Sequence, residues 1–429
     1  MRTHLVIPVL SGLLTGVLGS GLALAGSSRQ GHAPAPALFA QAALEPVGFA
    51  ELPGWAGDDH AQALATFRRS CGSIARKPDL VTPPRPMFTA LRQVCARAAR
   101  LPGKVGDRAA RAFFEKEFHP YRISALDRSE GFLTGYYEPE VEGARIRSDE
   151  YATPLYARPG DLVIEAPPGG GPPTNKSGAF REVDGRLVPY HDRAAIEDGV
   201  LQDKGLEIAW IRDPTDAFFA HIQGSVRVRL PDGEVLRLNY DGHNGQPYTP
   251  IGRLLIERGL VPREKMSMDA IRAYIAAHPE EGREPMRQNK SYVFFRVADE
   301  LKAGDGAVGA QGLPLTAGRS IAVDKAIHVY GTPFFLDAAL PTGTDGASEP
   351  FERLMIAQDT GSAIVGPARA DIFFGAGKEA GALAGRIQHP GRFTLLLPRA
   401  LDPARRRVPL PRPRPESAPR LPATVSETP

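Results

Sequence analysis

The chain has 429 residues, enough for two domains that each bury a substantial core. Its 52 basic and 49 acidic residues leave a formal net charge of +3, which gives no reason to expect a nucleic-acid partner. With 45 glycines and 41 prolines among many short apolar runs, the composition favours strands and loops over helical bundles.

Residues 1–25 predict a signal peptide. A basic start precedes a mostly apolar stretch, and Ala23-Leu24-Ala25 has the small-x-small form of a cleavage site. The alternative is an uncleaved membrane anchor, because the stretch is long enough to span a bilayer. Residues 26–45 are small and polar and predict a linker. No cysteine directly follows the apolar stretch, and no later run is long enough to cross a membrane. We therefore expect an exported protein that is not a lipoprotein.

Cys71 and Cys95 are the only cysteines of the sequence, and each lies on the apolar face of a predicted helix. A proline-rich run at 82–86 separates the two helices, which predicts a helical hairpin. In an exported chain an even number of cysteines predicts a disulfide, with two buried free thiols as the alternative. Because the histidines are scattered and no CxxC motif is present, we expect no metal and no cofactor.

Beyond these helices, short strands and turns predominate. Phe132–Tyr137 predicts a strand, and Ile222–Leu238 predicts a hairpin that turns at Pro231-Asp232-Gly233. Two amphipathic helices are expected at Thr249–Arg258 and Met268–Ala277.

Two carboxylates lie in apolar runs near the C-terminus: Asp359 within 356–366, and Asp371 within 370–375. An ionised carboxylate in apolar surroundings is costly unless it is paired or hydrogen-bonded. Its pKa therefore rises, as an acid catalyst at neutral pH requires. Either aspartate alone would also fit a turn cap or a structural hydrogen bond.

Several segments in order resemble the MltA-type lytic murein transglycosylases. The matching segments are Leu133–Pro139, Ile222–Ser225, Tyr240–Gly245, Ile251–Arg253 and Gln288–Phe295. The C-terminal "3D" segment of that family is named for three aspartates, which correspond to Asp324, Asp359 and Asp371.

The resemblance implies a mainly β fold with peripheral helices. A double-psi β-barrel domain would be built from residues 46–140 and 245–400, with the 3D segment at 319–397. A second, inserted β-barrel domain would span 141–244, and the substrate groove would lie between the two domains. The remaining residues, 401–429, are rich in proline and arginine and predict disorder.

The resemblance also implies the chemistry. The β-1,4 bond of peptidoglycan between N-acetylmuramic acid and N-acetylglucosamine would be cleaved with formation of a 1,6-anhydro end. Asp371 is implied as the catalytic acid and base, Asp359 as the group that tunes it, and Asp324 as structural. Arg369 stands where the best-known members often have histidine. Residues expected to line the groove are Thr134, Gly135, Gln223, Gly224 and Ser225. The partner would be glycan strands, in the periplasm of a Gram-negative cell.

Two other classes of function compete with this interpretation. Asp359-Thr360-Gly361-Ser362 is also the active-site signature of aspartic proteases. A single-chain protease of that type needs two such motifs, and the sequence has one. A non-catalytic cell-wall-binding protein is the second alternative, against which the presence of Asp371 argues.

Overall fold

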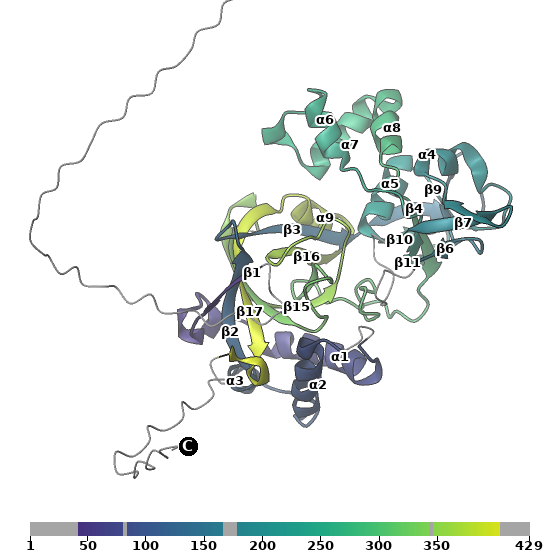
Figure 1. The fold of residues 1–429 in the computed structure, drawn as a ribbon. Coiled ribbons are helices and arrows are strands. Elements are labelled where there is room, and N and C mark those ends of the chain that lie inside the picture. The colour runs from purple at the N-terminus through teal and green to yellow at the C-terminus, as the bar shows by residue number, and fades with distance from the viewer. Residues whose placement is uncertain (1–41, 80–83, 166–177, 343–345, 404–429) are drawn as a thin grey trace, which may run out of the picture. The chain divides into compact units, whose positions relative to one another are not determined.

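The computed structural model describes residues 42–79, 84–165, 178–342 and 346–403 (Figure 1). The predicted signal peptide, most of the predicted linker and most of the predicted C-terminal tail lie outside these residues. No helix of the described segments is long and apolar enough to span a membrane.

The larger sheet closes into a β-barrel. Its strand order is β1-β2-β17-β14-β15-β13-β16-β3, and β3 pairs again with β17, so the six strands from β17 to β3 form a ring. The strands are β1 (Ala42–Pro46), β2 (Phe118–Ala125), β3 (Gly131–Glu138), β13 (Ser320–Val323), β14 (Pro333–Leu340), β15 (Glu349–Asp359), β16 (Arg369–Ala376) and β17 (Gln388–Pro398). This closed barrel confirms the predicted mainly β fold. Strand β1 begins inside the segment predicted to be a linker.

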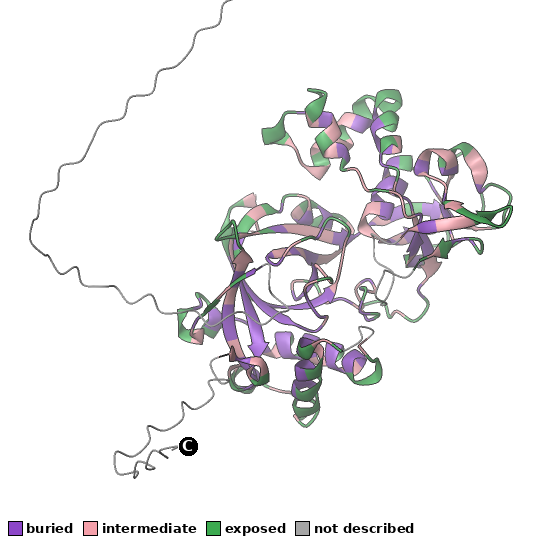
Figure 2. Cartoon of the chain, in the orientation of Figure 1, coloured by how far each residue is buried: buried purple, intermediate pink, exposed green. Residues whose placement is uncertain are grey.

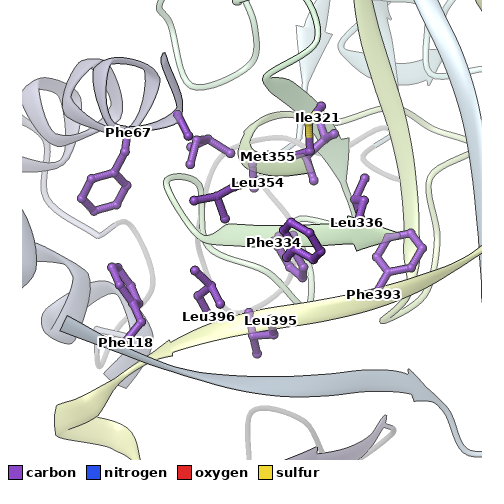
Figure 3. Close-up of a cluster of buried hydrophobic side chains, with 14 of the residues drawn as sticks. Phe67, Phe118, Ile321, Phe334, Leu336, Leu354, Met355, Phe393, Leu395 and Leu396 are labelled. Carbon is purple, nitrogen blue, oxygen red and sulfur yellow. The ribbon is translucent and has the colours of Figure 1, made fainter. Parts of the chain in front are cut away.

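Three helices pack against the barrel: α1 (His60–Arg76), α2 (Pro86–Ala98) and α3 (Asp107–Glu117). Phe67 of α1 and Phe118 of β2 meet Phe334 and Leu395 of the barrel strands in one apolar cluster (Figure 3). Buried residues accordingly follow the barrel strands and the inner faces of these helices (Figure 2). A disulfide joins Cys71 of α1 to Cys95 of α2, with 5.0 Å between their Cα atoms.

A second six-stranded sheet has the order β12-β11-β10-β4-β9-β5, and a bridge between Ala157 and Phe295 brings its two edges together. Its strands are β4 (Glu140–Ala144), β5 (Thr153–Tyr156), β9 (Glu207–Ile211), β10 (Ser225–Arg229), β11 (Val235–His243) and β12 (Val293–Val297). The sheet therefore includes one strand from beyond residue 244.

The remaining strands and α-helices of the described residues form a small sheet and six further helices, of which α9 packs against β3 and β16 of the barrel. The small sheet contains β6 (Val163–Ile164), β7 (Ala179–Val183) and β8 (Arg186–Pro189). The other helices are α4 (Arg193–Ala195), α5 (Pro214–Gln223), α6 (Ile251–Glu257), α7 (Met268–Ala277), α8 (Pro279–Gln288) and α9 (Gly377–Ala384). Helix α7 has the predicted bounds. The predicted hairpin is present as β10 and β11, but Ile222 and Gln223, expected within it, end helix α5.

A buried ion cluster ties the end of β3 to the second sheet. Arg237 of β11 donates from Nη2 to both carboxylate oxygens of Glu138, at 2.9 Å each. Arg227 of β10 donates from Nε to the same carboxylate at 2.8 Å. Further guanidinium donors of the two arginines reach the carbonyl oxygen of Asp305. Because Glu138 is only 1% exposed, its charge depends on these two partners.

Replacing Glu138 by glutamine should therefore destabilise the protein by about 3–5 kcal/mol, because it leaves two arginines without their buried counter-charge. Denaturant unfolding of the purified protein measures this. The matched control is Glu234→Gln, whose partner Arg145 lies in an exposed pair at 2.8 Å. That change should leave the unfolding midpoint nearly unchanged. Equal effects of the two substitutions would contradict a structural role for the buried cluster.

Candidate functional site

One row of residues across the barrel sheet carries both predicted site aspartates. Strand β13 lies between β15 and β16, and its Ala322 is the register partner of Asp359 on one side and of Asp371 on the other. Asp371 is also paired with Thr134 of β3. Directly paired residues point to the same face of a sheet. With neighbouring strands about 4.8 Å apart, the backbones of the two aspartates are separated by roughly 10 Å.

Asp371 is held through one oxygen. Thr134 donates from Oγ1 to Asp371 Oδ1 at 2.7 Å, and Arg369 donates from Nη2 to Thr134 Oγ1, also at 2.7 Å. None of the described residues donates a hydrogen bond to Oδ2. Burial raises the pKa of Asp371 to about 6, against the opposing effects of the Arg369 charge and the Thr134 hydrogen bond. The negative charge of Asp359 adds to the rise in this pKa. The carboxyl group therefore exchanges its proton close to neutral pH.

Asp359 is held through both oxygens. Its Oδ1 accepts from the backbone nitrogens of Ala310 and Thr360, at 2.8 and 2.9 Å, and its Oδ2 accepts from the Tyr136 hydroxyl at 2.8 Å. Burial raises the pKa of Asp359, and these three hydrogen bonds oppose that rise. These three hydrogen bonds hold the Asp359 carboxylate in a fixed position, from which its negative charge acts on Asp371.

Further titratable groups face this pair, and sequence reasoning had not singled them out. Burial, followed by the charge of Asp359, raises the pKa of Tyr136 well above its ordinary value. Burial raises the pKa of Tyr248 to about 12, and the charge of Asp371 contributes. The side chain of Lys325 interacts with Asp359 electrostatically, while burial lowers the pKa of its ammonium group. Strand alternation could have indicated Tyr136, since it lies two positions after Thr134 on the same face.

Asp324 lies at the end of β13 and is bonded to backbone. Its Oδ1 accepts from the nitrogen of Ala326 at 3.0 Å, and its Oδ2 accepts from the nitrogen of Gly366 at 2.9 Å. The side chain thus connects the turn after β13 to the loop that precedes β16.

Gly135 follows Thr134 and points to the opposite face of β3. A Cβ at this position would lie 2.8 Å from the Cα of Ala384 in α9 and 2.8 Å from the ring of Phe374. The absence of a side chain therefore lets α9 approach the strand that carries Thr134 and Tyr136.

The other three predicted groove residues lie at the junction between α5 and β10. Gln223 accepts a hydrogen bond at Oε1 from the backbone nitrogen of Tyr137, at 3.1 Å. Gly224 ends the helix with a φ of 75°, in the left-handed region that favours glycine, and Ser225 is buried at the start of β10. Thus Thr134 contacts Asp371 directly, whereas Gln223 contacts the same β3 strand further along.

Comparison with known proteins identifies the class and then the family. Residues 132–296 match the model of the MltA specific insert domain, and residues 319–397 match that of the 3D domain. The structure resembles that of membrane-bound lytic murein transglycosylase from Agrobacterium tumefaciens, with 38% identity and a TM-score of 0.74. That match covers 83% of this chain and 98% of the relative. MltA from Neisseria gonorrhoeae is 33% identical, with a TM-score of 0.67 over 85% of this chain and 94% of the relative.

Among curated proteins, membrane-bound lytic murein transglycosylase A of Escherichia coli K12 is 35% identical over 267 residues. The alignment covers 62% of this chain and 65% of the length of that relative. The fold and the site thus define a β-barrel protein of the 3D-domain class. Within that class, the chain belongs to the MltA family of lytic murein transglycosylases, which confirms the resemblance inferred from the sequence.

Replacing Asp371 by asparagine should stabilise the protein above neutral pH. The folded-state pKa of about 6 exceeds the ordinary value of 3.8, so the folded protein binds this proton more tightly than the unfolded chain does. Stability is therefore lost as pH rises from about 4 to beyond 6. The variant escapes this loss and should be more stable by about 1–3 kcal/mol near pH 8, and no more stable near pH 4.

Thermal unfolding of wild type and variant across this pH range measures the difference. Asp127→Asn, at a side chain that is 74% exposed, is the control and should show no comparable pH dependence. A stability difference that does not grow with pH would contradict the raised pKa of Asp371.

Proposed function

We propose that the protein is a lytic murein transglycosylase that cleaves the β-1,4 bond between N-acetylmuramic acid and N-acetylglucosamine. The observation that carries the proposal is the carboxyl group of Asp371. It has a pKa of about 6, one oxygen that accepts from Thr134, and a second oxygen without a donor among the described residues. Family membership supports the same activity, and the structure of E. coli MltA with bound chitohexaose is 28% identical, with a TM-score of 0.56.

In the first step, protonated Asp371 donates its proton to the glycosidic oxygen that leaves, while the C6 hydroxyl of the muramic sugar attacks C1 of the same sugar. Asp371, now a carboxylate, accepts the proton that the C6 hydroxyl loses, which restores the acid and leaves a 1,6-anhydro end. A pKa close to the working pH suits a group that must both donate and accept.

A second carboxylate is not required by this reaction. Hydrolytic glycosidases need one to activate water or to form a covalent intermediate. Here the nucleophile belongs to the substrate and is present at a high effective concentration. Asp359, with both oxygens engaged, raises the pKa of Asp371 through its charge. An aspartic-protease role is opposed by the sequence, because a single-chain protease of that type needs two Asp-Thr/Ser-Gly motifs and the sequence has one.

Among the predicted substrate-binding residues, Gln223 has a side-chain amide that can bind a sugar. Its Oε1 accepts from the Tyr137 nitrogen, which fixes the amide and leaves its Nε2 donors for a sugar hydroxyl or acetamido group. The substrate, peptidoglycan glycan strands, lies in the periplasm, and the signal peptide predicted at residues 1–25 would deliver the protein there.

Asp371→Asn should fold and yet lose about 10²–10⁴-fold of its activity on purified sacculi, because an amide cannot deliver the proton. Release of soluble muropeptides over time measures the loss, with Asp127→Asn as the control. Activity within about tenfold of wild type would contradict Asp371 as the acid.

Asp359→Asn should keep measurable activity, with the basic limb of its pH profile moved to lower pH. The charge of Asp359 raises the pKa of Asp371, so removal of that charge lowers the pKa and deprotonates the acid earlier. The pH dependence of kcat/KM on solubilised glycan strands measures the shift. A folded variant as inactive as Asp371→Asn would instead assign Asp359 a direct chemical role.

A further inference from the structure

We propose that Arg369 is a positioning residue that determines which oxygen of Asp371 carries the acid proton, and that it acts through the hydroxyl of Thr134. The inference rests on the proposed function, because it concerns the same acid. Arg369 is neither one of the three aspartates of the 3D segment nor one of the residues expected to line the groove.

The hydroxyl of Thr134 has one proton and can donate once. A guanidinium group only donates, so the 2.7 Å contact from Arg369 Nη2 must use Thr134 Oγ1 as the acceptor. The hydroxyl proton is then free to point to Asp371 Oδ1, the acceptor 2.7 Å away. The positive guanidinium group favours the rotamer in which the hydroxyl proton points away from it and toward Asp371, and without Arg369 this bias against accepting from a protonated Asp371 is lost.

The direction of this chain of hydrogen bonds selects the reactive oxygen. When Asp371 is neutral, Oδ1 accepts from Thr134 and the acid proton sits on Oδ2. No described residue donates to Oδ2, so this oxygen can deliver its proton to the glycosidic oxygen and later accept the proton of the C6 hydroxyl. Arg369 thus keeps Asp371 in the protonated form that can react, with the proton on Oδ2 and not on Oδ1.

The surroundings of Arg369 hold its guanidinium in place. Arg369 of β16 is paired with Phe132 of β3. This pair lies two residues before the pair of Asp371 and Thr134 and on the same face of the sheet. The guanidinium carbon lies 5.5 Å from the centre of the Phe132 ring, and Nη1 donates to the carbonyl oxygen of Ala370. Arg369 also lines a surface hollow of about 670 Å³, together with Arg128 and Val365 among others.

Charged and titratable groups face Asp371 from several elements. Arg369 comes from β16, Asp359 from β15, Tyr136 from β3, and Tyr248 from the segment before α6. Of these, Arg369 is the group that favours the ionised carboxylate, whereas the charge of Asp359 disfavours it. Removal of the arginine charge should therefore raise the pKa of Asp371 and extend activity to higher pH, even while the acid becomes less well positioned.

The test compares Arg369→Gln, Arg369→Lys and the control Arg128→Gln, which removes an exposed arginine from the same hollow. Arg369→Gln should lower the maximal kcat on glycan strands by about tenfold, within the range for a weakened acid. It should also move the basic limb of the pH profile upward. Arg369→Lys keeps the positive charge and a hydrogen-bond donor. Its pH profile should therefore have the wild-type basic limb, and it should keep most of the wild-type kcat. The proposal would be overturned if the basic limb of the pH profile did not move in Arg369→Gln, or if it moved equally in Arg128→Gln.

A double-substitution cycle tests whether the effect passes through Thr134. In a Thr134→Val background, Arg369→Gln should cost less than about twofold in kcat, because the hydroxyl to be oriented is already absent. The same tenfold loss of kcat in both backgrounds would contradict the proposal that Arg369 acts through the Thr134 hydroxyl.

NMR titration of isotope-labelled aspartate in substrate-free protein separates this inference from the proposed function. A higher Asp371 pKa in Arg369→Gln supports the electrostatic part whether or not the wild type forms anhydro products. An unchanged or lower Asp371 pKa in this variant would contradict the effect of the Arg369 charge on Asp371, while the proposed reaction would stand.

Discussion

Burial of the Asp371 carboxyl group is the constraint on which the rest of this structure depends. A carboxyl group in water would be ionised at neutral pH and would be a poor proton donor. The closed barrel supplies part of the apolar environment, since two neighbours of Asp371 on the same face of the sheet are buried: its register partner Ala322 and Phe373, two positions further along β16. The same environment penalises the ionised form, so the protein gives up stability near neutral pH for a carboxyl group that can exchange its proton there.

The barrel also fixes the spacing of the site. Asp359, Ala322, Asp371 and Thr134 occupy one row across four neighbouring strands. Ala322 is buried between the two aspartates, and its small side chain leaves the space through which their charges interact. Glu138 lies on β3, the strand of Thr134, and its arginine partners lie on the second sheet. Contacts of that sheet therefore restrain a strand that carries part of the acid site.

Local patterns predicted much of the fold. The apolar spacing of 268–277 gave the exact bounds of α7, and Ser267 caps that helix by accepting from the nitrogen of Ala270. Helix α5 was missed, although Pro214 at its start and Gly224 just after its end are ordinary boundary signals. The aspartates were found because each interrupts an apolar run. Thr134 was expected in the groove, but its contact with Asp371 was not predicted, because the two residues are 237 positions apart and only the pairing of β3 with β16 joins them. Spacing within a strand also cannot show the direction in which a hydroxyl donates.

In the proposed reaction the nucleophile comes from the substrate and water does not take part. Digestion of sacculi by the wild-type protein in water enriched in heavy oxygen, followed by mass spectrometry of the products, tests this most directly. We expect muropeptides that are lighter by one water than hydrolytic products and free of the heavy isotope. Reducing ends that carry heavy oxygen would contradict an internal nucleophile and would make the protein a muramidase that activates water.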